Sequence, residues 1–144
     1  MKINFKNLLF FCCYITFQGC RASSLADWVG KYPFDKINNK KADHYILDEK
    51  SKFKIPSQEK RNIRKLDVSD EISVTNGYAF VQKCMPHNCP AFHAIIIEGP
   101  KGKWWVGFYE ENESFTSTRW YGSDDHTKIP SDISDMFMKS HAPK

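Results

Sequence analysis

The sequence predicts an α+β domain, an antiparallel meander of about five strands with flanking helices. Two observations support this prediction. From residue 71 onward, apolar and polar side chains alternate in short runs that are separated by turn residues. On both sides of these runs, apolar residues recur at helical spacing. A chain of 144 residues with 41% hydrophobic residues can bury one core. We expect residues 24–140 to form this single domain.

The first nineteen residues are typical of a secretory signal peptide. Lys2 and Lys6 precede the apolar run LLFFCCYITF, residues 8–17. A run of ten residues suits the hydrophobic region of a signal peptide and is too short to cross a bilayer as a helix. We therefore expect residues 1–19 to be removed and the protein to reach the periplasm.

The end of the signal peptide admits two interpretations. Gly19-Cys20 resembles a bacterial lipobox, in which the cysteine is acylated and becomes the first mature residue. Cleavage after Ala22 by an ordinary signal peptidase is the alternative. The cysteine count favours lipidation, because Cys20 would otherwise be an odd thiol in an oxidising compartment. Cys20 is thus the lipidation candidate, and the only membrane contact expected is through its anchor.

Three segments carry helix signals, and one is left unassigned. The serines of SSLADWVGKY can cap a helix in which Leu25, Trp28, Val29 and Tyr32 share a face, and Pro33 would end it. Residues 57–66 follow Pro56, with Ser57 as the expected N-cap. Residues 131–140 predict a short final helix begun by Ser131. Residues 36–55 have no clear pattern.

The strand signals begin with EISVT and YAFVQK, which flank Asn76-Gly77. Both positions of such a two-residue hairpin turn need positive φ, which Asn and Gly tolerate. AFHAIIIEG, KWWVGFYEE and SFTSTRWYG follow, joined by Gly99–Gly102 and by a polar turn. The alternate residues of AIII, with Trp104 or Trp105, are too apolar to be solvated on both sides, so we expect the flanking helices to cover one face of the sheet.

The charge pattern does not indicate nucleic-acid binding. Residues 31–65 carry eleven Lys and Arg against five Asp and Glu, and residues 66–144 carry seven against eleven. The lysines are scattered, no nucleic-acid motif accompanies them, and the export signal points away from the nucleoid. We interpret the basic segment as a solvated face.

The most unusual stretch is KCMPHNCP, residues 83–90, which places Cys84 and Cys89 around Met85, Pro86, His87 and Asn88. In an exported protein the two cysteines should form a disulfide. A ring this small stabilises a fold by only about 2 kcal/mol, so its main effect is to fix the shape of the loop. Pro86 restricts the loop further. The tip then presents an imidazole and an amide before any partner arrives.

Metal binding and catalysis fit these residues poorly. Cys84, His87, Cys89 and His93 offer soft ligands, but their spacing is not that of structural zinc sites, and an oxidised pair cannot ligate. The same pairing removes a nucleophilic thiolate. Two acidic clusters are interpreted as solvated loop tips: Glu110, Glu111 and Glu113, and Asp124, Asp125 and His126. We therefore expect no enzyme, cofactor or metal. A stapled hairpin without a recognition role stays open.

A fourth interpretation rests on a resemblance. The hexapeptide Cys84–Cys89 resembles the signature loop of the inhibitor of vertebrate lysozyme (Ivy) family, usually written Cys-Lys-Pro-His-Asp-Cys. Cys84, Pro86, His87 and Cys89 match, whereas Met85 replaces the lysine and Asn88 the aspartate. The stretches DWVGKYPFD and RWYG are also similar to small bacterial proteins that bear this loop with asparagine. The resemblance implies a periplasmic α+β domain whose loop plugs the active site of a lysozyme.

The resemblance assigns roles to the loop residues. His87 would enter the cleft of a lysozyme or another muramidase, Cys84, Cys89 and Pro86 would preorganise it, and Asn88 would orient it or cap the loop. Met85 would adapt to the partner's groove. Two alternatives remain: an immunity protein against a rival's peptidoglycan hydrolase, and an envelope binding or structural domain that inhibits nothing. We assign no role to His44, His93, His126 or His141.

Overall fold

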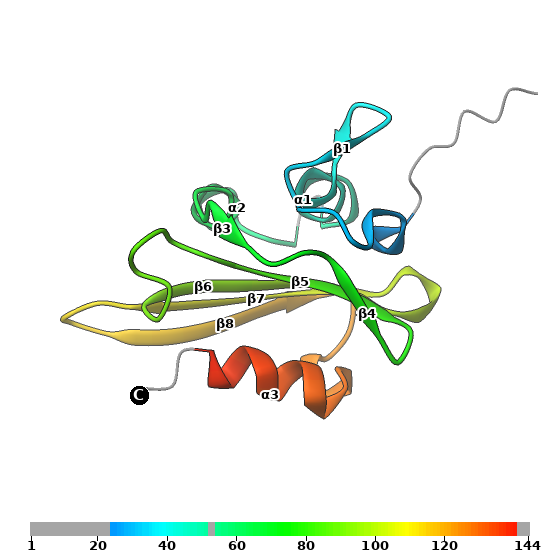
Figure 1. Cartoon of the computed structure of the whole chain (residues 1–144). Coiled ribbons are helices and arrows are strands. Elements are labelled where there is room, and N and C mark those ends of the chain that lie inside the picture. Colours follow the sequence, from blue (N-terminus) through cyan, green and yellow to red (C-terminus); the bar gives the residue numbers. More distant parts are fainter. Residues whose placement is uncertain (1–23, 52–53, 141–144) are drawn as a thin grey trace, which may run out of the picture.

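The computed structural model describes residues 24–51 and 54–140. The expected signal peptide at 1–19, Cys20, Ala22 and His141 lie outside these residues. Figure 1 shows a twisted antiparallel sheet between two layers, with the N-terminal helices on one face and the last helix on the other. The predicted α+β class with an antiparallel sheet and flanking helices is therefore confirmed.

The sheet has six strands, and every pair of neighbours is antiparallel. β5 (Tyr78–Cys84), β6 (Phe92–Glu98), β7 (Trp104–Glu111) and β8 (Thr116–Gly122) form the predicted meander. At the edge, β3 (Val68–Ser69) and β4 (Ser73–Thr75) both pair with β5. β4 and β5 are joined at Asn76-Gly77, where φ is 52° and 79°, as the predicted hairpin turn requires. β3 was not predicted from the sequence.

The apolar run of β6 is buried because both faces of the sheet are covered. Ala94 and Ile96 pack with Trp104, Val106 and Phe108 beneath the N-terminal layer. Ile95 and Ile97 pack with Trp105 and Tyr109 against α3 (Ser131–Lys139), which contributes Ile133 and Phe137. α3 approaches closely, since a Cβ at Gly107 would lie 3.0 Å from the Phe137 ring. The sequence predicted one covered face of the sheet, whereas both faces are covered.

The first helix is much shorter than expected. Ser24 caps it through a capping box, as predicted, but the element is a single 3-10 turn, η2 (Leu25–Trp28). Gly30 then takes a φ of 74°, and its N–H donates to the carbonyl of Ile72. Ile72 returns a bond to the carbonyl of Lys31. Pairing with Ile72 therefore replaces the helix, and the helical spacing of Val29 and Tyr32 was misleading.

The unassigned segment folds into the rest of the N-terminal layer. β1 (Lys36–Ile37) and β2 (Lys40–Lys41) form a hairpin whose turn residues Asn38 and Asn39 both have positive φ. α1 (Ala42–His44) runs into a π-helix, η3 (Tyr45–Lys50), that buries Tyr45, Ile46 and Leu47. The buried Glu98 ties this layer to β6, because its carboxylate accepts bonds from the backbone N–H of Leu25 and the hydroxyl of Tyr45.

The two later helices lie where expected, with one correction. α2 (Ser57–Arg64) buries Ile63, and Leu66 is buried just beyond it. Ser57 is the first helical residue and Pro56 occupies the N-cap, so the predicted capping role of Ser57 was wrong. Ser131 begins α3 as predicted. The remaining helical elements of the described residues are two 3-10 turns. η4 (Pro100–Gly102) lies between β6 and β7, and η5 (His126–Lys128) lies between β8 and α3. No helix in the described ranges is long and apolar enough to cross a bilayer.

Candidate functional site

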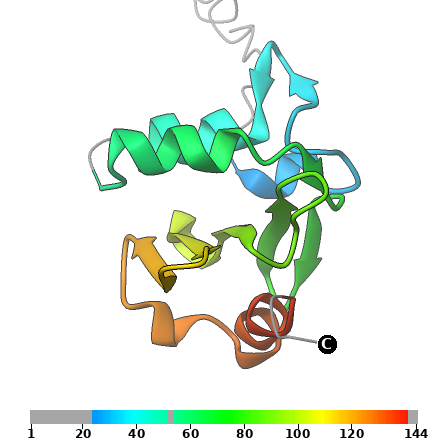
Figure 2. The ribbon, with the colours of Figure 1, turned by 90° about the vertical axis from the view of Figure 1, so that its left-hand side faces the viewer.

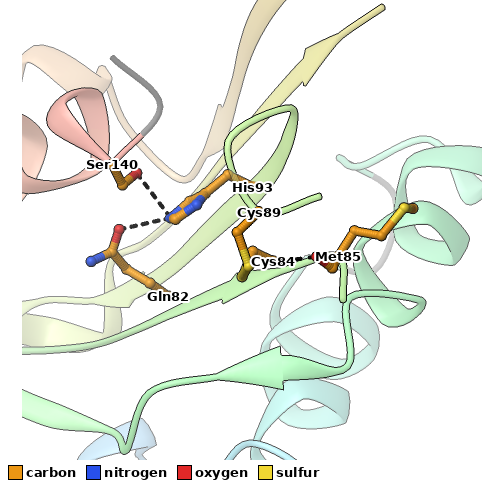
Figure 3. The surroundings of a disulfide bond; sticks show 6 residues. All are labelled: Gln82, Cys84, Met85, Cys89, His93 and Ser140. Atoms are coloured by element: carbon orange, nitrogen blue, oxygen red, sulfur yellow. Dashed lines mark hydrogen bonds between the residues drawn. A yellow bond between two sulfur atoms is a disulfide. The ribbon is translucent and has the colours of Figure 1, made fainter. Parts of the chain in front are cut away.

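The cysteine loop projects from one end of the sheet, between β5 and β6. Cys84 is the last residue of β5, and Cys84 and Cys89 form the expected disulfide with their Cα atoms 4.7 Å apart. Figure 3 shows the bridge at the base of the loop, beside the end of α3. The ring thus closes directly on the rigid end of a central strand.

The tip of the loop is a type II β-turn. The N–H of Asn88 donates to the carbonyl of Met85 at 3.0 Å, so Pro86 and His87 are the two central residues. His87 has a φ of 61°, which the second central position of a type II turn requires, and proline suits the first. A histidine accepts this φ less readily than glycine. The conformation is imposed by Pro86, the turn bond and the disulfide together.

The imidazole of His87 faces solvent. The residue is exposed, and no hydrogen bond or ion pair joins it to another residue of the described chain. Asn88 is exposed as well. The loop therefore presents an imidazole and an amide on a closed turn, with their polar atoms available to a partner.

Backbone hydrogen bonds hold the base of the loop. The N–H of Met85 donates to the carbonyl of Phe92 at 3.1 Å, and the N–H of Phe92 donates to the carbonyl of Asn88 at the same distance. On the next strand, the N–H of Glu111 donates to the carbonyl of Ala91 at 2.8 Å. The closing contacts at Asn88 thus come from its backbone, and the loop is fixed to both β6 and β7.

Met85 points inward. Its half-buried side chain packs against the core below the N-terminal layer. With Leu66, Phe92 and Phe108 it lines a cavity of about 130 Å³ beside α2. Figure 3 shows the side chain reaching toward the helices. Met85 is placed to anchor the loop, whereas the sequence suggested a flexible contact with a partner's groove.

His93 lies beside the disulfide at the base of the loop, and no role there was assigned to it from the sequence. It pairs with Cys84 across the β5–β6 ladder and is buried. Its Nε2 lies 2.8 Å from Oε1 of Gln82 and 3.0 Å from Oγ of Ser140, just after α3 (Figure 3). The end of α3 is thereby tied to the sheet beside the disulfide. No signal in the sequence predicted this, because it depends on where α3 packs.

A second projection lies at the same end of the sheet (Figure 1). The turn between β7 and β8 is ordered by the side-chain oxygen of Asn112, which accepts bonds from the N–H groups of Ser114 and Phe115. Phe115 is 45% exposed. Because Glu111 is bonded to Ala91, this turn sits next to the cysteine loop. The neighbouring turn therefore carries an exposed apolar side chain.

The acidic clusters are not arranged as catalytic pairs. Glu110 binds Arg119 at 2.9 Å. Hydrogen bonds from Lys103 and Lys128 hold the pKa of the Asp124 carboxyl well below its usual range. Nowhere in residues 24–51 and 54–140 do three or more His, Cys, Asp or Glu side chains gather as metal ligands would. Glu110 and Asp124 are thus each paired with a neighbouring Arg or Lys side chain.

Comparison with known proteins identifies the family. The family model described as inhibitor of vertebrate lysozyme (Ivy) matches residues 55–143, more than half of the chain. No curated protein and no solved structure matches the chain. The match covers the cysteine loop and all of the six-stranded sheet. The chain therefore belongs to the Ivy family, whose members are inhibitors of lysozyme and are not enzymes.

Proposed function

We propose that this protein inhibits its target by inserting the Cys84–Cys89 loop into the active-site cleft, with His87 as the leading side chain. The family implies a lysozyme as the partner and suggests a periplasmic protein. The observation that carries the proposal is the exposed imidazole on a type II turn that a disulfide closes. A loop already fixed in shape loses little conformational entropy on binding.

The chemistry of the target suits an imidazole. Retaining glycosidases, of which lysozyme is the type case, hold two carboxyl groups about 5–5.5 Å apart, one protonated and one ionised. One ring nitrogen of His87 can donate to the ionised carboxylate, and the other can bond to the acid. A neighbouring carboxylate favours the imidazolium, which makes the hydrogen bond charge-assisted and stronger. His87 is a central, exposed residue of the turn, so its ring is accessible to such a pair of carboxyl groups.

The two departures from the family loop bear on which muramidase is bound. Asn88 lacks the carboxylate that the family loop carries at this position, which removes one possible salt bridge to a cationic enzyme. Met85 lacks the positive charge of the lysine that the family loop carries at this position. Its packing against the core supports a role in anchoring the loop. These changes favour a target that differs from vertebrate lysozyme. A muramidase delivered by a rival bacterium is the second candidate target, and the protein would then confer immunity.

We infer the location from the sequence of the first twenty residues. We propose that residues 1–19 are a signal peptide and that Cys20 is acylated, which would anchor the domain to the outer membrane. In that position the loop would meet a muramidase as it crosses the envelope. Mass spectrometry of the mature N-terminus tests this, since a diacyl or triacyl cysteine differs from a chain that begins at Ser23.

The test of the proposed function is a turbidity assay on peptidoglycan. Lysozymes of several classes and muramidase effectors are assayed with and without the purified protein. We expect stoichiometric inhibition of at least one of these enzymes. If every enzyme on the panel keeps its full rate while retained on the immobilised protein, the domain binds muramidases without blocking the cleft, and the proposal is wrong.

Opening the ring should weaken inhibition more than it weakens the fold. We expect Cys84→Ser/Cys89→Ser to lose at most about 2 kcal/mol of unfolding free energy, as the chain-entropy estimate for so short a ring implies. The loop would then have to be ordered on binding, so the dissociation constant for the target should rise at least about tenfold. Calorimetric unfolding and titration of the same samples measure both. Equal inhibition by the open variant would contradict preorganisation.

A further inference from the structure

The segment before the family match presents an exposed aromatic and basic surface. The Ivy match begins at residue 55, so the β1–β2 hairpin and the turn before it lie outside it. Tyr32 and Phe34 are 38% and 50% exposed, and their rings stack with centroids 5.4 Å apart. Lys31 and Lys36 are exposed next to them. Together with Lys41 of β2, these residues are called the N-terminal patch.

Hydrogen bonds hold the turn that carries the aromatic pair, Tyr32 and Phe34. The N–H of Asp35 donates to the carbonyl of Tyr32 at 3.0 Å, and the Asp35 carboxylate accepts the N–H of Tyr32 at 2.9 Å. Pro33, between the two rings, is buried, and its carbonyl accepts the N–H of Asp43. Three hydrogen bonds therefore fix the backbone of the turn that carries the two rings. Two ordered aromatic rings stay in solvent, although burial of apolar surface is favourable.

Two lysines of the patch lie opposite each other in the hairpin. Lys36 and Lys41 are directly opposite in the β1–β2 ladder. Like charges at opposite positions of an antiparallel pair are destabilising. Lys40 is different, because Glu49 binds it at 2.5 Å. No ion pair joins Lys31, Lys36 or Lys41 to an acid in the described part of the chain. An anion between Lys36 and Lys41 would relieve their repulsion.

A hollow lies where this anion would bind. It has a volume of about 250 Å³ and is lined by Lys36, Asn39, Lys40, Lys41, His44 and Glu49. Amphipathic aromatic rings that flank a basic surface are typical of segments that bind at the membrane–water interface. Juxtamembrane lysines are attracted to anionic headgroups. Lys36 connects the two features, since it lines the hollow and lies two residues after Phe34 in the chain.

We propose that the N-terminal patch docks on a membrane surface rich in anionic phospholipid. Tyr32 and Phe34 insert at the level of the headgroups, and Lys31, Lys36 and Lys41 contact the lipid phosphates. Figure 1 shows the β1–β2 hairpin standing away from the sheet on the side opposite α3, while the cysteine loop projects along the sheet. Figure 2, viewed along the sheet, shows the same separation. Docking therefore leaves the inhibitory loop accessible.

The test uses the full chain with Cys20→Ser, purified from the cell envelope, so that no acyl chain contributes to partitioning. Two kinds of vesicle are compared, phosphatidylglycerol with phosphatidylethanolamine, and phosphatidylcholine alone. We expect amide hydrogen exchange to slow at residues 29–41 on the anionic vesicles only. Lys36→Gln/Lys41→Gln should lower the partition coefficient at least about tenfold. Tyr32→Ser/Phe34→Ser should lower it while leaving the net charge unchanged.

The matched controls are chosen on the other surfaces. Lys101→Gln/Lys139→Gln removes the same charge from exposed residues of η4 and α3, and should leave partitioning unchanged. Phe115→Ser removes an exposed ring elsewhere and should also have no effect. Unchanged exchange at residues 29–41, or equal losses in the two lysine pairs, would overturn the proposal. If inorganic phosphate alone slows exchange at residues 29–41 as much as the anionic vesicles do, the patch is an anion site without lipid docking, which would also overturn the proposal.

Discussion

Replacing His87 by alanine should reduce inhibition of the target at least about tenfold and leave the melting temperature nearly unchanged. The side chain is exposed and has no hydrogen bond or ion pair within the described chain, so the fold does not depend on it. In the complex it would pair with two desolvated carboxyl groups. Removing one member of such a set typically costs about 2–5 kcal/mol, because the others are left buried without a partner. Inhibition titrations and calorimetric unfolding measure the two effects.

The controls for the alanine variant are chosen for the backbone conformation at position 87. His87 has a φ of 61°, so a loss in the alanine variant could come from a changed turn. His87→Asn and His87→Gly accept positive φ at little cost, and neither carries an imidazole. All three variants should lose inhibition to a similar extent. Full inhibition by the asparagine or glycine variant would show that the turn matters and the imidazole does not.

Replacing Lys83 by methionine should have the largest effect on stability. Lys83, beside Cys84 in β5, is only 4% exposed, and its Nζ lies 3.5 Å from Oδ2 of Asp43 in α1. Asp43 is 8% exposed. Without Lys83, a buried carboxylate is left unpaired, which typically costs about 3–5 kcal/mol. Urea unfolding of the variant measures this loss, and Lys139→Met, at an exposed position of α3, should show almost none.

A second variant separates loss of the pair from loss of packing. Lys83→Met/Asp43→Leu removes both charges and should recover most of the stability, since a buried ion pair is often no better than apolar residues of similar size. If the double variant is as unstable as the single one, the methylene packing of Lys83 matters and its charge does not.

The same pair gives the stability a defined pH dependence. Burial lowers the pKa of Lys83 below its ordinary 10.5, and the nearby Asp43 opposes this only in part. Between the lowered pKa and 10.5, the unfolded chain binds more protons than the native one, so the free energy of unfolding rises with pH. The neutral amine formed when Lys83 loses its proton can still donate a hydrogen bond to Asp43, which methionine cannot do. The methionine variant has no group that titrates here, so it lacks this rise. Its deficit against the parent protein should therefore widen as the pH approaches 10.5.

The sheet could be predicted because its signals are local. Alternation in β5 to β8 and the pair Asn76-Gly77 depend on neighbouring residues, and the structure follows them. The short strand β3 could not be predicted, because its partner Cys84 lies far along the chain and only two residues pair. The first helix was overestimated because Val29 and Tyr32 have helical spacing, whereas Gly30 and Ile72 pair instead.

The disulfide-closed loop of the candidate site could be predicted from the sequence. The contacts that hold this loop in place could not. The spacing of Cys84 and Cys89, with Pro86 between them, indicated a closed loop, and the disulfide is present. Two features needed three-dimensional packing: the inward direction of Met85, which depends on α2 and the core, and the link from His93 to Ser140. The residues next to a side chain in the sequence do not show which residue it will contact in another layer of the fold.

Competition with an active-site ligand tests the central claim most directly. A chitin oligosaccharide that occupies the cleft of the inhibited lysozyme is titrated into a binding measurement between that enzyme and this protein. If the His87 loop fills the cleft, the apparent dissociation constant should rise in proportion to the oligosaccharide concentration, and no ternary complex should form. An unchanged dissociation constant, with enzyme, oligosaccharide and protein bound together, would show that the loop does not enter the cleft.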